Sequence, residues 1–285
     1  MHEPFLSSRR AVVKSSIFGM LLVSIPNIVF SRTIATKKAE QLTDAYSRYP
    51  SIDDSIVAEV VGVSHFNLPR LKELVDKRPE LARATWDWAF GDWETAIGAA
   101  SHVARRDIAM YLMSKGARPD IFTFAMLGAF DAVKNMIASQ PGIQTIKGPH
   151  GISLLQHAKN GLAADGITPS EKENSAKLVS YLEGLGNADV SEKYLDMEDT
   201  DKNKYLGDYK YGEGPMDGFS IKLNMRKMIS LGKPGKFGGA LYKKSNNVFI
   251  YNGTTSIEIT FAFENDKVVS LTVHEPDLTI TARKI

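Results

Sequence analysis

Residues 94–120 read ETAIGAASHVARRDIAMYLMSKGARPD and are the most informative segment for the fold. It has the pattern of one helix–turn–helix unit that ends in the Gly116-Ala117 turn, and similar units lie on both sides of it. A lone unit of this kind cannot bury its own apolar face, so such units stack into a solenoid with an extended concave surface. The sequence therefore predicts an architecture suited to binding another molecule on that concave surface.

The apolar anchors of the second helices repeat along the chain. These first buried aliphatic residues are Leu71, Ile108, Val133 and Leu178. They lie 37, 25 and 45 residues apart, which averages close to 36. The short gap predicts a unit that has lost its hairpin finger, and the long gap predicts an added loop at Ala163–Asn174. First helices at 56–64, 95–101, 123–129 and 153–159 are expected to form the other wall of the stack.

Two phrases of the second unit carry a family resemblance. ETAIGAA at 94–100 is similar to the ankyrin phrase Thr-Pro-Leu-His-x-Ala-Ala, and YLMSKGARPD at 111–120 is similar to the ankyrin phrase Leu-Leu-Leu-x-x-Gly-Ala-Asp. Ala96 and Gly98 depart from the Pro and His of that pattern. Together with KGPHGISLLQHAKNG at 147–161, residues 86–109 also resemble a bacterial group of exported ankyrin proteins of unknown function. The resemblance implies ankyrin repeats over roughly residues 50–190.

From Tyr205 onward, short alternating or β-branched runs replace the helical pattern. Eight such runs are separated by turn residues such as those at 246–247 and 265–266. They predict an antiparallel meander or half-barrel, whose interior is either a filled core or a pocket. YLGDY at 205–209, with ITFAFENDKVVSLTVHE and ARKI near the end, resembles lipocalin-like β modules found behind serine-hydrolase domains. That resemblance implies an accessory fold without established chemistry.

The first 35 residues have the pattern of an export signal. The basic pair Arg9-Arg10 precedes an uncharged run at 15–31. SSRRAVVKSS at 7–16 resembles a bacterial twin-arginine signal, with Val12-Val13 in place of the usual Phe-Leu. The alternative is an uncleaved membrane anchor, and Pro26 inside the run argues against a stable spanning helix.

The predicted fold class is thus an ankyrin-type α-solenoid followed by a small antiparallel β meander or half-barrel. We expect a signal peptide at 1–35, an ankyrin repeat domain at 36–195, a linker at 196–204 and a β domain at 205–285. The protein is expected to be periplasmic or exported from a bacterial cell.

Composition excludes several classes of protein. The 43% hydrophobic and 24% charged residues are typical of globular chains. The net charge of +2 resides in residues 1–35, which carry +3, so the remainder is about −1. A concentrated positive surface for nucleic acid is therefore not expected. The absence of cysteine excludes disulfides, thiolate chemistry and a lipid-modified cysteine anchor.

The loop ATWDWAFGDWETA at 84–96 holds all three tryptophans of the chain. Large aromatic side chains on a finger-like loop are favoured as binding anchors. The alternative is that they close the core between the first two units. The predicted binding residues are Trp86, Trp88, Trp93, Asp87, Asp92 and His150.

Two stretches have the spacing of known catalytic or metal-binding motifs but lack the structural context that those motifs require. Ser230 and Lys233 have the spacing of a Ser-x-x-Lys pair, but that pair needs a helix, and these residues lie on a strand that enters a turn. Asp199, Asp201 and Asn203 resemble the start of a calcium loop without its glycine and its bidentate Glu, so a solvated linker is expected there. We predict no cofactor, no metal and no enzymatic activity.

The histidines carry the alternative hypothesis. His65 and His102 occupy the same place in successive units, each after a Ser at the end of a first helix, and capping or packing explains both. His150 lies on a loop that could face the groove. The side chains that could converge there as metal ligands are Asp87, Asp92, Glu94, His102 and His150.

The sequence therefore predicts a non-enzymatic recognition module that binds a protein partner through its groove and finger loops. The alternative is a small-molecule or metal-dependent activity, either in the β module or at an acid–histidine cluster on the ankyrin groove. A third hypothesis is an envelope scaffold without a dedicated ligand. Nucleic acid is not expected as a partner, and a membrane is expected only through an uncleaved signal.

Overall fold

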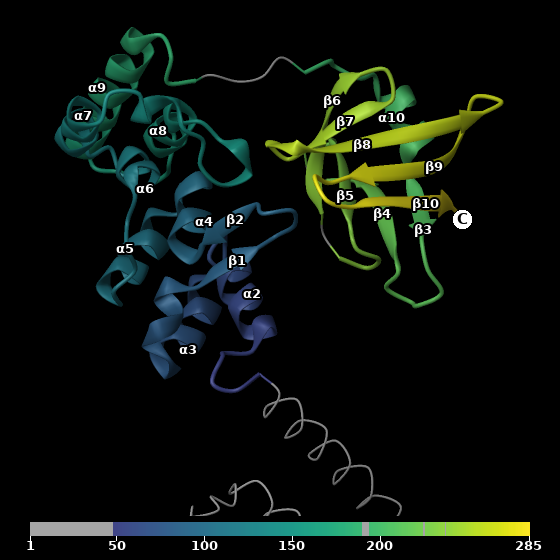
Figure 1. The fold of residues 1–285 in the computed structure, drawn as a ribbon. Coiled ribbons are helices and arrows are strands. Elements are labelled where there is room, and N and C mark those ends of the chain that lie inside the picture. Colours follow the sequence, from purple (N-terminus) through teal and green to yellow (C-terminus); the bar gives the residue numbers. More distant parts are fainter. Residues whose placement is uncertain (1–47, 190–193, 225, 237) are drawn as a thin grey trace, which may run out of the picture. The chain divides into compact units, whose positions relative to one another are not determined.

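The computed structural model describes residues 48–189, 194–224, 226–236 and 238–285 (Figure 1). The chain divides into two compact units, Met1–Asp53 and Asp54–Ile285, and the features below belong to the second unit. The predicted signal at 1–35 lies outside the described residues. Within the described part of the chain, no helix is long and apolar enough to cross a membrane.

Four pairs of short helices fill the described residues 54–189 (Figure 1). They are α2 (Asp54–Val63) with α3 (Leu68–Lys77), α4 (Ala96–His102) with α5 (Arg106–Ser114), α6 (Ile121–Met126) with α7 (Phe130–Ser139), and α8 (Leu154–Leu162) with α9 (Pro169–Leu185). The first helices contact one another in chain order, α2 with α4, α4 with α6 and α6 with α8. The burial of the four predicted anchors is confirmed, because Leu71, Ile108, Val133 and Leu178 are fully buried.

Side-chain caps decide where several of these helices begin. Thr95, Asp120 and Ser153 each accept a hydrogen bond from the backbone N–H three residues later, which is the usual role of a helix N-cap. Thr168 forms a capping box with Glu171 at the start of α9. The loop predicted at 163–174 is therefore too long, since the helix begins inside it.

A short hairpin connects the first two helix pairs. After η1 (Pro79–Arg83), β1 (Thr85–Asp87) pairs antiparallel with β2 (Trp93–Thr95), and Trp86 lies opposite Glu94. Side chains alternate between the two faces of a strand. Trp93 is accordingly 62% exposed, whereas Glu94 is fully buried. The hairpin thus places the carboxylate of Glu94 in the interior, beside α2 and α4.

The strands of the C-terminal part close into a barrel (Figure 1). They are β3 (Gly207–Lys210), β4 (Gly218–Leu223), β5 (Ile229–Gly232), β6 (Gly239–Ser245), β7 (Val248–Tyr251), β8 (Thr254–Glu264), β9 (Lys267–His274) and β10 (Thr279–Lys284). Each strand pairs antiparallel with the next along the chain, and β10 pairs with both β9 and β3. The eight runs predicted between 205 and 285 thus correspond to eight strands among the described residues.

The fold class predicted from the sequence, an α-solenoid followed by a meander or half-barrel, is wrong, because the C-terminal sheet is a closed barrel. Closure depends on the pairing of Arg283 with Lys210 and of Lys284 with Tyr209, between the two ends of the sheet. Alternating residues look the same in an open and in a closed sheet, so the local pattern does not reveal this pairing.

The barrel interior is filled with buried side chains. Tyr209, Phe249 and Phe261 belong to one core cluster, and Tyr205 packs its ring against both phenylalanines. Tyr205 ends α10 (Asp199–Tyr205), a helix that occupies most of the predicted linker at 196–204. The helix therefore supplies part of the barrel core.

Replacing Gly161 with Ala should destabilise the helical part strongly. A Cβ atom at this position would lie 1.9 Å from the backbone oxygen of Met126, so α8 and α6 would have to move apart. Overpacking of this kind costs about 3 kcal/mol. Gly184, in α9, is the matched control, because a Cβ there meets nothing within 4 Å. In urea unfolding, we expect G184A to stay within about 1 kcal/mol of the wild type; equal stabilities for the two variants would contradict the close helix contact.

Candidate metal centre

Four side chains from distant parts of the chain converge on one point. They are His65, which follows α2, Glu94 in β2, His102 at the end of α4, and His150 in η3 (Pro149–Gly151). Each offers one ligand atom, and these atoms all lie within 4.8 Å of one another. We refer to these four residues as the His–Glu cluster.

The helix repeat places two of the histidines side by side. Ser64, directly after α2, and Ser101, in the last turn of α4, each donate a hydrogen bond from the side chain to the carbonyl four residues earlier. A histidine follows each serine, so His65 and His102 lie at the ends of neighbouring helices. Their ring centroids are 4.9 Å apart.

The hairpin orients the carboxylate. Trp88 donates from Nε1 to Oε2 of Glu94 over 2.7 Å, which fixes the rotation of the carboxylate. Its other oxygen, Oε1, lies 2.9 Å from Nδ1 of His102 and 3.4 Å from Nε2 of His150. Nε2 of His65 lies 3.4 Å from Oε2. A fully buried carboxylate therefore faces three imidazole nitrogens.

A second carboxylate holds His150 in place. His150 has a left-handed backbone with φ of 60°, and its backbone N–H donates to Oδ1 of Asp92 over 3.0 Å. Its Nδ1 lies 2.7 Å from Oδ2 of the same residue. Because Asp92 accepts a hydrogen bond from Nδ1, we assign the proton of a neutral ring to Nδ1, which leaves the lone pair of Nε2 directed toward Glu94.

His65 is oriented in the same way by the backbone. Its Nδ1 lies 3.0 Å from the carbonyl oxygen of Gly62, an acceptor, so Nδ1 carries the proton and Nε2 is free to act as a ligand. Such hydrogen bonds behind the ligating nitrogen are the usual outer contacts of metal-binding histidines. Both residues thus present Nε2 to Glu94.

Two buried atoms of the cluster have no aligned hydrogen-bond partner. Oε1 of Glu94 and Nδ1 of His102 are only 2.9 Å apart, yet neither makes a hydrogen bond of acceptable geometry. Leaving such atoms unpaired in the interior is costly. Both residues belong to the group whose ligand atoms all lie within 4.8 Å of one another, close enough to hold a cation.

The spacing of the ligand atoms fits a transition-metal ion. Zinc binds imidazole nitrogen and carboxylate oxygen at about 2.0–2.2 Å in a tetrahedron, so neighbouring ligand atoms are about 3.3–3.6 Å apart. Nδ1 of His102 and Nε2 of His150 lie 2.9 and 3.4 Å from Oε1 of Glu94, close to that spacing, and Nε2 of His65 lies 3.4 Å from the other oxygen, Oε2. The four ligand atoms lie within 4.8 Å of one another, so binding an ion would require side-chain movements that bring them to the tetrahedral spacing.

The pKa values reflect the same concentration of charge. Burial acts to raise the pKa of Glu94, but its close contacts with His102 and His150 outweigh burial and hold that pKa well below its usual range. Burial acts to lower the pKa of His150, but its hydrogen bond to Asp92 and its close contact with Glu94 raise that pKa to about 10. Burial lowers the pKa of His65. Glu94 is therefore an anion at neutral pH and attracts a cation.

The structure separates the predicted site residues into two groups. Trp88, Asp92 and His150 contact the cluster or belong to it. Trp93 is 62% exposed, Trp86 is partly buried, and Asp87 accepts a hydrogen bond from the backbone N–H of Gly91 in the hairpin turn. The tryptophans therefore do not act as one group.

Sequence reasoning named two of the four cluster residues, Glu94 and His102, only under the alternative hypothesis, and it assigned His65 to capping or packing. The signal that could have found His65 is the dipeptide Ser-His, which recurs at 64–65 and 101–102. A histidine at the same position of neighbouring units brings two imidazoles together. In the sequence that repeat was interpreted as capping or packing, and no metal was predicted.

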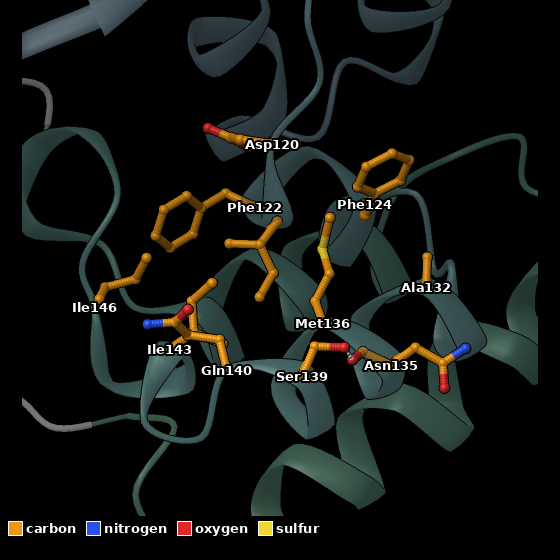
Figure 2. Close-up of a pocket in the computed structure, with 11 residues that line it drawn as sticks. Asp120, Phe122, Phe124, Ala132, Asn135, Met136, Ser139, Gln140, Ile143 and Ile146 are labelled. Carbon is orange, nitrogen blue, oxygen red and sulfur yellow. Dashed lines mark hydrogen bonds between the residues drawn. The ribbon is translucent and has the colours of Figure 1, made fainter.

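Two of the hollows formed by the described residues lie on the helical part. His102 lines one of about 840 Å³, together with Arg106 and Asn160, so open space reaches a residue of the cluster. The other, of about 760 Å³, lies between α6 and α7 and is mainly apolar, as Figure 2 shows. Asp120, the one ionisable residue among its described lining, caps α6. We therefore place the chemistry at the His–Glu cluster.

No family model matches the chain, and no curated protein matches it. The interpretation of the site therefore rests on its geometry.

Proposed function

We propose that this chain binds one divalent transition-metal ion, zinc by preference, through the His–Glu cluster. The observation that carries the proposal is the convergence of three imidazole nitrogens on the buried Glu94, with Oε1 of that residue and Nδ1 of His102 both lacking an aligned hydrogen bond. An ion between these atoms would satisfy all of them at once.

The donor set favours zinc and its neighbours over other common ions. Calcium and magnesium prefer shells of oxygen ligands. Three imidazoles with one carboxylate suit zinc, copper, nickel or iron, which bind nitrogen well. Among these, zinc tolerates a four-coordinate tetrahedral site most readily. The charge also fits, since a divalent ion bound by one carboxylate and three neutral rings forms a centre with a net charge of about +1, which the nearby Asp92 offsets.

A structural role fits the site better than a catalytic one. Structural zinc sites use four protein ligands, whereas catalytic sites keep a position open for water or substrate. The cluster supplies four side chains, which come from four separate segments of the chain between His65 and His150. An ion bound there would tie α2, the hairpin, α4 and the η3 loop together.

The competing occupant of the same space is a proton. A protonated His150 would donate to Asp92 through Nδ1 and approach Glu94 through Nε2, and its raised pKa of about 10 is consistent with that state. In that state Nδ1 of His102, which lies 2.9 Å from Oε1 of Glu94, would have to carry a proton and turn toward that oxygen to make a hydrogen bond. This second reading predicts a chain that binds no metal.

Titration of the metal-free chain with cobalt(II) distinguishes the two readings. We expect saturation at about one ion per chain, with the intense visible absorption of a four-coordinate site, and displacement of cobalt by one equivalent of zinc. A featureless titration, or a weak six-coordinate spectrum, would favour the proton-only network. Elemental analysis of the chain purified without chelator should agree with the stoichiometry.

The function predicted from the sequence, recognition of a protein partner, stays a prediction. The exposed ring of Trp93 is the feature of the hairpin that favours it. Trp88, by contrast, is bonded to Glu94, so its replacement would disturb the cluster as well as any surface contact.

A further inference from the structure

The β-barrel contributes a side chain to the surroundings of the cluster. Asn252, in the turn between β7 and β8, is 7% exposed. Its Nδ2 donates to Oδ2 of Asp92 over 2.5 Å and lies 3.0 Å from Nδ1 of His150. Two donors, one from the barrel and one from the η3 loop, thus share a single oxygen of Asp92.

The backbones of the same two segments are in direct contact. Gly151 and Gly253 both have left-handed backbones, with φ of 68° and 81°. A Cβ atom on Gly253 would lie 2.9 Å from Cα of Gly151. Only glycine allows this approach in both loops. The barrel turn therefore fits against the loop that carries His150.

The tip of the hairpin makes a third contact with the barrel. The ring of Phe90 meets Tyr251 edge to face, with centroids 4.8 Å apart, and Phe90 packs against the barrel core cluster. Asp92, which follows in the same hairpin, accepts the hydrogen bond from Asn252. A side-chain hydrogen bond, a backbone contact and a ring contact thus join the barrel to the hairpin and to the η3 loop, the two segments that position His150.

We infer that the barrel completes the metal site, with Asn252 as a positioning residue that acts through Asp92 on His150. The inference rests on the proposed metal binding. By donating to Asp92, Asn252 holds the carboxylate in the rotation in which it accepts both the backbone N–H and the Nδ1 proton of His150. That arrangement directs Nε2 of His150 into the cluster. Outer contacts of this kind change metal affinity by about 10- to 100-fold.

Coupling of this kind is reciprocal. If the barrel turn strengthens metal binding, then the bound metal must hold the turn in place by the same factor. We therefore expect slower amide hydrogen exchange at residues 250–254 when zinc is bound. The barrel turn would then be part of the metal site.

The test compares Asn252→Gly with Asn265→Gly in the full chain. Both residues have left-handed backbones in hairpin turns, with φ of 30° and 48°, so glycine removes the side chain without backbone strain, and Asn265 is exposed. We expect N252G to bind zinc about 10- to 100-fold more weakly and to shift the cobalt(II) spectrum, while N265G matches the wild type. In N252G, zinc should no longer slow exchange at 250–254.

A second variant separates an effect on metal binding from a general loss of structure. Asn252→Asp keeps the shape of the side chain but places a carboxylate against Asp92, so we expect a larger loss of affinity than in N252G. Unfolding curves of the metal-free variants show whether each is folded. Wild-type affinity and spectrum in folded N252G and N252D, with zinc still bound by the wild type, would overturn this inference alone. A wild-type chain that binds neither zinc nor cobalt would overturn the proposed function and this inference together.

Discussion

Replacing Glu94 with Gln is expected to lower zinc affinity about a thousandfold or more, equivalent to about 4 kcal/mol. The change keeps the shape of the side chain, and its amide oxygen can still accept the hydrogen bond from Trp88. It removes the negative charge that faces the three imidazole nitrogens and weakens the oxygen ligand. Competition with a coloured zinc chelator measures the affinity directly.

Asp87→Asn is the matched control for this prediction. Asp87 lies in the same hairpin and accepts a hydrogen bond from Gly91, at the turn rather than in the cluster. The same isosteric loss of charge should therefore leave the zinc affinity within about twofold, a difference of less than 1 kcal/mol. If E94Q and D87N bound zinc equally well, Glu94 could not be a ligand.

Zinc should also raise the stability of the wild-type chain by a large amount. A ligand that binds only the folded state adds about 4 kcal/mol at a thousandfold excess over its dissociation constant. For a unit of this size, that corresponds to a rise of about 10 °C in Tm. The physical reason is that the ion ties together segments from His65 to His150, which are separate in the unfolded chain.

Thermal unfolding in the presence of zinc or of a chelator measures this effect. E94Q should show little change between the two conditions, whereas the wild type should lose its added stability in chelator. A wild-type Tm that is the same in zinc and in chelator would mean that the cluster is held by protons and hydrogen bonds alone.

The helices of this chain could be predicted because their signals are local. Leu71, Ile108, Val133 and Leu178 each begin an apolar stripe of helical period, and all four are fully buried. The eight strands were likewise marked by alternation and by turn residues. Closure of the barrel had no such local signal, because it depends on the pairing of β3 with β10, the first and last strands of the sheet.

The cluster was harder to predict than the elements that carry it. Asp92 and His150 were named as binding residues, but their contact spans 58 positions of the chain. His65 and His102 have a sound local explanation, since each follows a serine at a helix end. Only the packing of α2 against α4 and the entry of β2 beside them show that these rings share a carboxylate. The contribution of Asn252 is more distant still, 160 positions from Asp92.

The most direct test of the metal centre is an anomalous difference map at the zinc absorption edge, from a crystal of the chain grown with one equivalent of zinc. We expect a single strong peak within about 2.0–2.2 Å of one nitrogen from each of the three histidines and of a carboxylate oxygen of Glu94. A map without a peak at the cluster, or with zinc only at surface histidines, would contradict it.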